Sequence, residues 1–233
     1  MQHHLISEVE SEAPTNPVAS GLERAIHEQR LPPGTRLAEA ELCEIYGVSR
    51  TIVRAGLQAL THSHLVTLVP NRGARVAQPT PADAREVFEA RELIEPRTAR
   101  EAARKATRTD VELLLKHNTE EHKSLEAREY GRSLRLSGLF HTEIARISGQ
   151  KTLLGFVEQL VARSALIIAL YWHRERARCD SQCHMKLIDA IAAGNPDEAE
   201  TLMRSHLIDI HSALDFGETN SERSLKELLS AST

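Results

Sequence analysis

The sequence is poor in aromatic residues and in cysteine. Phenylalanine, tyrosine and tryptophan make up 3% of its 233 residues, whereas alanine, leucine, glutamate and arginine are abundant. This composition favours a mainly α protein. The three cysteines, Cys43, Cys179 and Cys183, are odd in number and follow no pattern. They argue against a disulfide framework and fit a reduced, cytoplasmic protein.

Long apolar runs are also missing. No stretch approaches about 18 uninterrupted apolar residues, so we expect no membrane span. The N-terminus lacks a basic region followed by an apolar core, which excludes a secretory signal. We expect residues 1–16 to be a disordered tail and residues 221–233 to be a second tail. A hydrophobic content of 41% is sufficient for a core, and the length suits two domains.

The net charge is small and negative, −4 at pH 7, so the chain as a whole does not attract polyanions. Residues 17–78 are the exception, because they carry seven arginines and five glutamates but no lysine or aspartate. Their excess of positive charge is slight. Any binding to nucleic acid must therefore depend on individually placed arginines rather than on a broad basic surface.

Residues 17–78 have the pattern of a winged helix-turn-helix. We expect helices over about 18–29 and 38–46, with Pro-Pro-Gly in LPPGTRL forcing a turn between them. Ser49 can cap a third helix, whose buried face is predicted to be Ile52, Val53, Leu57 and Leu60. The segment LVTLVPNRGARVA then predicts a short β-hairpin.

The third helix carries side chains suited to DNA. If its N-terminus enters the major groove, Ser49, Arg50 and Thr51 meet phosphates or bases. Arg54 lies one turn deeper and can hold a guanine, which is worth about 1–3 kcal/mol of discrimination. Asn71, Arg72 and Gly73 of the hairpin can approach the backbone or the minor groove. The alternative is that Arg50 and Arg54 only solvate a helix face.

In this region the sequence resembles the GntR family of bacterial transcription regulators. The resemblance is carried by PPGTRLAEAELCEIYGVSRTIVRAGLQAL and LVTLVPNRGARVA, in which PG-x-R-L, GVSRT-x-VR and PNRG-A occur at the expected separations. It implies DNA contacts by Arg36 in addition to the residues above. Gly56 departs from the family pattern at a position where a helix former is usual. By propensity it should weaken the third helix by up to about 1 kcal/mol relative to alanine.

After a proline-rich linker at residues 79–82, residues 83–220 read as an all-α helical bundle without strands or internal repeats. The periodicity predicts helices over about 81–104, 108–127, 130–148, 151–176, 178–193 and 195–217. GNP at 194–196 marks the last break, with Gly194 ending one helix and Asn195 capping the next.

Three histidines lie within apolar stripes of this bundle and are expected to point inward: His141, His184 and His206. A single inward histidine is more often a hydrogen-bonded core residue than a ligand. Three histidines on separate helices could instead converge on one metal ion. Position alone leaves both interpretations open.

FHTEIARISGQ, HMKLIDAIAAGNPDEAETLMRSHL and RELIEP resemble the effector-binding domain of the FadR-type branch of the GntR family. The resemblance implies a divalent metal, zinc or nickel, held by His141, His184 and His206 and by an aspartate one turn before the first histidine. That position is Ser137 here. Serine is a weak neutral ligand, so a coordination position is expected to be open to water or to an effector.

Two arginines are candidates for binding an anionic effector near this metal. Arg163 lies in an apolar stripe, although it could also extend along an interface. Arg91 lies one turn before Glu95 and could equally form a helix ion pair with it. Cys179 and Cys183 precede His184, but nothing else near them has zinc-finger spacing.

The sequence therefore predicts a homodimeric, cytoplasmic transcription regulator that binds palindromic double-stranded operator DNA. Its helical domain is expected to sense a small carboxylate metabolite and to act through the linker around residues 78–82. One alternative is a hydrolase-like enzyme using the three histidines, but it lacks an acidic residue near them in sequence. Another is a DNA-binding protein without a ligand, which would leave the buried polar cluster without a purpose.

Overall fold

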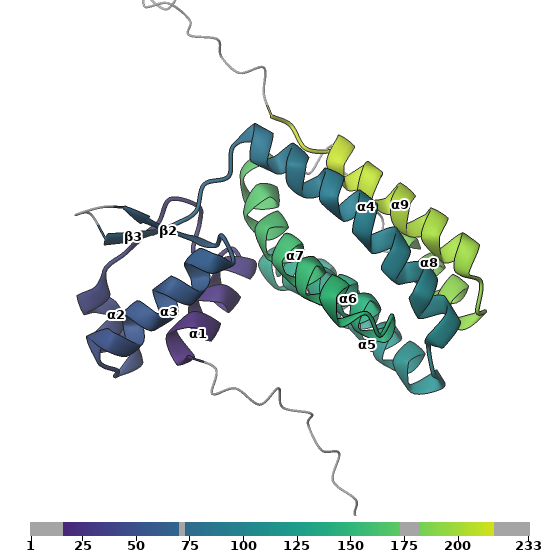
Figure 1. Cartoon of the computed structure of the whole chain (residues 1–233), viewed down its shortest axis with the longest axis horizontal. Coiled ribbons are helices and arrows are strands. Elements are labelled where there is room, and N and C mark those ends of the chain that lie inside the picture. The colour runs from purple at the N-terminus through teal and green to yellow at the C-terminus, as the bar shows by residue number, and fades with distance from the viewer. Residues whose placement is uncertain (1–15, 70–72, 173–181, 217–233) are drawn as a thin grey trace, which may run out of the picture.

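The N-terminal part of the protein is a winged helix-turn-helix, as the sequence predicts. In the computed structural model, residues 16–69, 73–172 and 182–216 are described. The N-terminal elements lie together at one end of the molecule (Figure 1). They are α1 (Pro17–His27), β1 (Arg36–Leu37), α2 (Glu39–Tyr46), α3 (Arg50–His62), β2 (Val66–Val69) and β3 (Gly73–Val76).

The starts of α1 and α3 are fixed by side-chain caps. The side chain of Asn16 accepts hydrogen bonds from the backbone amides of Val18 and Ala19, at 3.0 and 3.1 Å. Its amide nitrogen also donates to the carbonyl of Ile52, at 2.8 Å. Ser49 caps α3 through the amide of Ile52, which confirms the predicted cap. Asn16 therefore both starts α1 and ties it to α3.

Close packing of α1 on α3 corrects two expectations about the third helix. Ile52 is 39% exposed, so it does not belong to the buried face, which consists of Val53, Gly56, Leu57 and Leu60. A Cβ added at Gly56 would lie 2.7 Å from Oδ1 of Asn16. Glycine is thus the residue that lets the two helices approach, and alanine would not strengthen this helix.

The hairpin forms as predicted, and β1 adds a third strand that sequence reasoning missed. The strand order is β1-β3-β2, with both pairs antiparallel. Arg36 of β1 lies opposite Arg75 of β3, and Thr67 of β2 lies opposite Arg75 on the other side. Paired residues share a face of a sheet, and all three are exposed.

The C-terminal part is the predicted helical bundle. Its helices are α4 (Pro81–Lys105), α5 (Arg108–Glu126), α6 (Tyr130–Ile147), α7 (Lys151–Tyr171), α8 (Gln182–Ala192) and α9 (Pro196–Ser212). Thr80 and Asp83 form a capping box that starts α4, so the expected linker at 79–82 overlaps its first turn. The helix predicted over 151–176 ends at Tyr171, and residues 173–181 lie outside the described chain.

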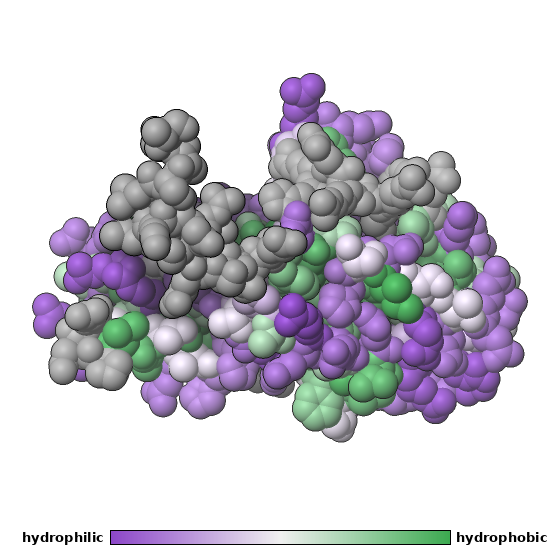
Figure 2. Space-filling view, turned by 90° about the horizontal axis from the view of Figure 1, so that it is seen from above, coloured by the Kyte–Doolittle hydropathy of each residue, from purple (hydrophilic) through white to green (hydrophobic). Residues whose placement is uncertain are grey.

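The bundle has two sides, which Figure 1 separates clearly. Helices α4 and α9 run side by side on one side, and α6 and α7 pack together on the other. The largest buried cluster of the bundle joins α4, α5, α6, α8 and α9 around Phe140, Ile144, Leu187 and Met203. Seen from above in Figure 2, the described surface is mainly hydrophilic, with apolar residues in separate groups.

The hydrophobic core of the N-terminal part continues into the helical bundle. Ala162 and Leu166 of α7, which are 3% and 1% exposed, belong to the same buried cluster as Val18, Leu22 and Ile26 of α1. Helix α1 also contacts α6. The DNA-binding part is therefore packed onto the bundle through α1 as well as connected to it by the chain.

Helix α7 is apolar enough, and long enough, to satisfy a compositional test for a membrane span. In this fold it contributes seven buried residues to the protein interior: Val157, Val161, Ala162, Ser164, Ala165, Leu166 and Ile167. A third of its apolar window is buried, and Phe156 and Leu170 are exposed, so packing within the chain accounts for only part of its apolar composition.

Candidate functional site

Three buried histidine side chains converge inside the bundle. His141 lies on α6, His184 on α8 and His206 on α9, and they are 2–4% exposed. Nε2 of His206 lies 3.2 Å from Nε2 of His184 and 3.2 Å from Nε2 of His141. The expectation that the three residues point inward is confirmed, and they meet at one point.

Two carboxylates orient His141 and His184 by contacting the ring nitrogens that face away from the centre of the cluster. Nδ1 of His141 lies 2.6 Å from Glu95 of α4, and Nδ1 of His184 lies 2.9 Å from Glu121 of α5. A carboxylate can only accept, so each histidine carries its proton on Nδ1. The Nε2 atoms of His141 and His184 consequently face the centre of the cluster.

Glu95 remains ionised although it is fully buried. Burial alone would raise the pKa of its carboxyl group, but Arg91 and His141 outweigh that effect and lower the pKa to about 2. Nε of Arg91 donates to Glu95 at 2.5 Å. Burial lowers the pKa of His141 and of His206, so both imidazoles are neutral at pH 7. Neutral imidazole is the form that binds metals.

The donor set fits a divalent metal ion better than a hydrogen-bonded core. The Nε2 atom of His206 can donate at most one hydrogen, yet it contacts the Nε2 lone pairs of two other histidines. A cation satisfies all three nitrogens together. Ligand atoms of a tetrahedral zinc ion lie about 3.4 Å apart, close to the 3.2 Å of the two nitrogen pairs that include His206, and the ligand atoms of all three histidines lie within 4.8 Å of one another. Carboxylates on the far nitrogens are the usual support of such ligands.

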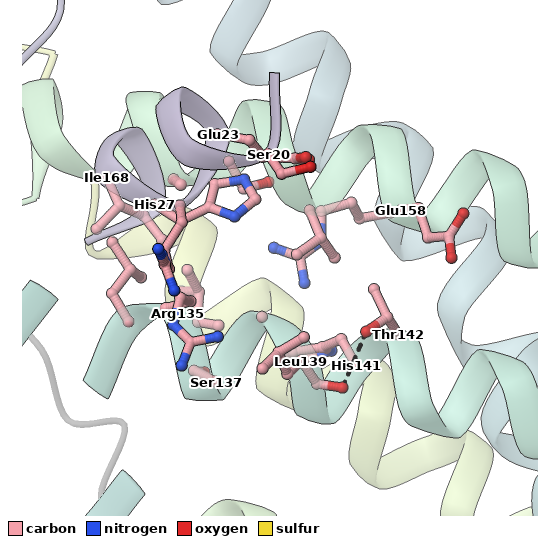
Figure 3. A pocket seen from close by; sticks show the side chains of 18 residues that line it. Ser20, Glu23, His27, Arg135, Ser137, Leu139, His141, Thr142, Glu158 and Ile168 are labelled. Atoms are coloured by element: carbon pink, nitrogen blue, oxygen red, sulfur yellow. Dashed lines mark hydrogen bonds between the residues drawn. The ribbon is translucent and has the colours of Figure 1, made fainter. Parts of the chain in front are cut away.

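One member of the histidine cluster, His141, lines a cavity of about 430 Å³, within the range of small-molecule sites. Figure 3 shows His141 and Ser137 on one wall, with Ser20, Glu23 and His27 of α1 above them. The polar groups that line it are Ser20, Glu23, Arg24, His27, Arg91, Arg135, Ser137, His141, Thr142, Glu158 and Ser164. The cavity therefore lies between the bundle and α1.

The predicted effector residues divide into two groups. Ser137 and Arg91 line the cavity, and Ser137 precedes His141 by one turn of α6. Arg91 also forms the ion pair with Glu95 that was its alternative interpretation, although the pair is buried rather than exposed. Arg163 is not among the lining residues. Hydrogen bonds from Thr80 lower the pKa of Asp83, and the charge of Arg163 contributes to the same direction.

Sequence reasoning missed both supporting carboxylates. Glu121 lies 63 positions before His184 and Glu95 lies 46 before His141, so no local spacing connects them. In RELIEP, Glu95 is followed directly by Pro96, but nothing in that local pattern points to His141. Cys183 is a free thiol outside the histidine cluster, and Cys179 lies outside the described residues.

The predicted DNA-binding side chains form an exposed surface. Ser49, Arg50, Thr51 and Arg54 are exposed at the start of α3, and Arg36 and Gly73 are exposed on the sheet. Asn71 and Arg72 lie outside the described residues. Nε of Arg54 lies 2.9–3.0 Å from both carboxylate oxygens of Glu39 on α2, so Arg54 is paired before any DNA arrives.

Comparison with known proteins assigns both parts of the chain. Residues 14–76 match the model of bacterial regulatory proteins of the gntR family, and residues 86–209 match the FCD domain. The chain is 30% identical to the HTH-type transcriptional regulator LutR of Bacillus subtilis, over 79% of this chain and 93% of LutR. It is 26% identical to the HTH-type transcriptional repressor NanR of Escherichia coli, over 88% and 86%.

Solved structures agree with this assignment. A GntR regulator from Rhodococcus sp. RHA1 superposes with a TM-score of 0.73 at 25% identity, covering 85% of this chain and 95% of that one. McbR/YncC of E. coli reaches the same TM-score at 20% identity, over 82% and 92%, and supports the fold alone. The protein is thus a transcription regulator rather than an enzyme, and it belongs to the gntR family of bacterial regulatory proteins, with a C-terminal FCD domain.

Proposed function

We propose that the protein is a homodimer that binds a palindromic operator and responds to a small carboxylate metabolite bound beside a metal ion. The observation that supports this proposal is the convergence of three buried imidazoles, of which His141 lines a cavity. A buried donor set next to a ligand-sized space suits sensing. Its proposed target is bacterial DNA, so we place the protein in the cytoplasm.

In this proposal, His141, His184 and His206 hold a zinc or nickel ion, while Ser137 provides no negative charge. The metal would supply a strong positive charge for an anionic ligand. Three neutral ligands leave that charge uncompensated, and a carboxylate oxygen is a suitable partner for it. Arg91 lies beside the same cavity, although Glu95 already neutralises it. The proposal assigns Arg163 no role in binding the effector.

For DNA, Ser49, Arg50 and Thr51 at the start of α3 would meet phosphates or base edges, and Arg54 would read a base. Arg36 and the wing residues Asn71, Arg72 and Gly73 would hold the backbone. To this predicted set we add Arg75, because it shares the exposed sheet face with Arg36. Two adjacent arginines on one face suit phosphate contacts.

The proposed dimer follows from the symmetry of a palindrome. Helix α7 offers a surface for it, since Phe156 is 50% exposed and Leu170 is 38% exposed on the most apolar helix. Light scattering during size-exclusion chromatography would test the dimer. A monomeric mass at micromolar concentration would contradict it.

The whole proposal can be tested on the purified, zinc-loaded protein. Selection from random duplexes should yield a palindromic site, and gel shifts should show that a small carboxylate changes the affinity for that site. The carboxylate effect should disappear when His206 is replaced by alanine, while binding to the site remains. Selection of no common sequence, or a carboxylate effect that survives His206→Ala, would contradict the proposal.

A further inference from the structure

Helix α1 of the DNA-binding part forms one wall of the cavity. Figure 3 shows α1 above the cavity and α6 below it. Helices α4, α6, α7 and α9 supply the remaining walls, and the lining residues from α1 are Ser20, Glu23, Arg24 and His27. If α1 moved away from the bundle, the cavity would lose this wall.

Three observations define how α1 is held against the bundle. Leu166 of α7 is buried in the same cluster as Ile26 of α1. Nε of Arg135 on α6 lies 3.2 Å from the carboxylate of Glu28, the residue that ends α1. A Cβ added at Gly131 of α6 would lie 1.8 Å from the carbonyl oxygen of Glu28, so glycine is required there. We call these contacts of α1 and Glu28 with α6 and α7 the docking contact.

The docking contact contains two buried polar atoms without hydrogen bonds. Nε2 of His27 has no partner within the described part of the chain, and Nε of Arg135 is not aligned for a hydrogen bond with Glu28. The two side chains interact, because burial and then the charge of Arg135 lower the pKa of His27. Among the described residues, Oδ1 of Asn118 is the one other buried side-chain atom of this kind. Unsatisfied polar atoms are therefore concentrated where α1 meets α6.

These two atoms oppose the docking contact. A polar atom that is buried without a partner gives up the hydrogen bonds that it makes with water, which costs free energy. Separation of α1 from α6 would restore those bonds to His27 and Arg135, but it would expose Leu166 to water. Burying an apolar side chain and leaving polar atoms unpaired are terms of similar size and opposite sign. The docked and separated positions are thus close in free energy.

We propose that the docking contact opens and closes reversibly, and that a ligand in the cavity favours the closed position because α1 completes its site. The DNA-binding part then takes part in ligand binding directly, in addition to any path through the linker around residues 78–82. The role of the ligand rests on the proposed function, since it takes the cavity to be the effector site. The opening of the contact does not depend on that function.

Opening of the docking contact would move the recognition helix. Helix α1 shares a buried cluster with Val53 and Leu57 of α3, and the side chain of Asn16 donates to the carbonyl of Ile52, so α1 and α3 move together. In a dimer, two such helices must meet half-sites that are spaced by whole turns of DNA. A ligand that shifts the docking equilibrium therefore changes operator affinity.

A distance measurement tests the two positions directly. Donor and acceptor dyes are attached through Glu44→Cys on α2 and Glu112→Cys on α5, both exposed positions, in a full-length chain whose native cysteines are replaced by serine. Labelled chains are mixed with excess unlabelled chains, so that each dimer carries one dye pair. Single-molecule energy transfer should resolve a closed and an open population in the zinc-loaded parent.

Four variants connect those populations to the docking contact. Gly131→Ala should abolish the closed population, because its methyl group cannot fit against Glu28. Gly155→Ala, where an added Cβ meets nothing within 4 Å, is the matched control and should behave as the parent. His27→Leu removes the unpaired nitrogen and should raise the ratio of closed to open chains about fivefold or more. If Gly131→Ala does not fold, Arg135→Glu should open the contact, and adding Glu28→Arg to it should restore the closed population.

Operator DNA connects the contact to regulation. Malate, aspartate and glutamate are added to the zinc-loaded proteins. An acid that changes operator affinity in the parent should raise the closed fraction there, and its effect on affinity should fall about fivefold or more in Gly131→Ala. If none of the three acids changes the affinity of the parent, the proposed function fails together with the role of the ligand, whereas the dye distances still decide whether the contact opens.

Three results would overturn the inference. One is a single dye distance in the parent that Gly131→Ala leaves unchanged. Another is an unchanged or smaller closed fraction in His27→Leu. The third is an acid effect on operator affinity that is equal in the parent and in Gly131→Ala, which would leave the proposed function standing and show that docking of α1 takes no part in it.

Discussion

The carboxylate of Glu95 and Nδ1 of His141 lie 2.6 Å apart in the interior of the bundle, where both side chains are no more than 2% exposed. Their positions come from different helices, α4 and α6. The contact directs Nε2 of His141 toward the other two histidines. Glu121 does the same for His184 from α5. The geometry of the site therefore depends on residues that do not themselves meet at its centre.

Removing the charge of either carboxylate should weaken metal binding. We expect Glu95→Gln and Glu121→Gln to reduce zinc affinity by about 10–100-fold, because each histidine loses its orienting charge. Competition with a chromophoric chelator measures the affinity. Glu112→Gln, which removes an exposed ion pair with Arg108, is the control. An unchanged affinity in both Glu95→Gln and Glu121→Gln, with thermal stability intact, would contradict this assignment.

Replacing Gly56 by alanine tests the contact between α1 and α3. Helix propensity alone predicts a gain of about 1 kcal/mol. The close approach of Asn16 predicts instead a loss of about 1–3 kcal/mol in the free energy of unfolding, the usual cost of overpacking. Denaturant unfolding measures the difference. Gly155→Ala on α7, where an added Cβ meets nothing within 4 Å, is the matched control and should not destabilise. A stabilised Gly56→Ala variant would refute the packing argument.

The type and order of most elements could be predicted from the sequence, because local signals determine them. Asn195 and Pro196 start α9, Ser49 caps α3, and apolar spacing identifies the buried stripes. The two-residue strand β1 gave no such signal, since it exists only by pairing with β3. Ile52 and Gly56 were misread for a related reason. Which side of α3 is buried depends on where α1 docks.

Only part of the candidate site could be predicted from the sequence. The three inward histidines follow from their stripes, and resemblance to a known family grouped them as metal ligands. Glu95 and Glu121 are distant in sequence from the histidines that they contact. Contacts of this kind are products of tertiary packing. The involvement of α1 in the cavity could not be predicted either, because it requires the packing of two parts that have separate sequence patterns.

Arg54 should distinguish the operator from random DNA. We expect Arg54→Ala to reduce that discrimination by about 1–3 kcal/mol, whereas Arg72→Ala should weaken binding to both more evenly. Glu39 holds Arg54 in the free protein, so Glu39→Gln should release it and raise the affinity for the operator. Gel shifts with operator and random probes measure all three. Equal losses on both probes for Arg54→Ala would rule out base readout by this residue.

His27 should make stability depend on pH. Burial, and then Arg135, lower the pKa of its imidazole to about 4, although Glu28 opposes this, while an unfolded histidine has a pKa of about 6.5. Between these values the unfolded chain takes up a proton that the folded chain does not. The free energy of unfolding should therefore fall as the pH decreases from 6.5 to 4.

Comparing variants separates the contribution of His27 to the pH dependence of unfolding from the contributions of the other buried histidines. In His27→Gln, the decrease in the free energy of unfolding between pH 6.5 and 4 should be smaller than in the parent. His62→Gln, an exposed histidine on α3, should retain the parental decrease. Denaturant titrations at several pH values provide the comparison. Identical pH profiles for the parent and His27→Gln would show that His27 is not held neutral by burial.

The most direct measurement for the account as a whole is the zinc affinity of the parent and of Ser137→Asp, each with and without aspartate or malate present. We predict that the parent binds one zinc ion per chain and that an acid which binds raises its zinc affinity. Linkage requires zinc to raise the affinity for that acid by the same factor. Ser137→Asp should bind zinc more tightly and couple less to the acid, because its own carboxylate fills the open position. A parent that binds no zinc even with both acids, or a Ser137→Asp variant with unchanged zinc affinity, would contradict the account and leave the three histidines as core residues.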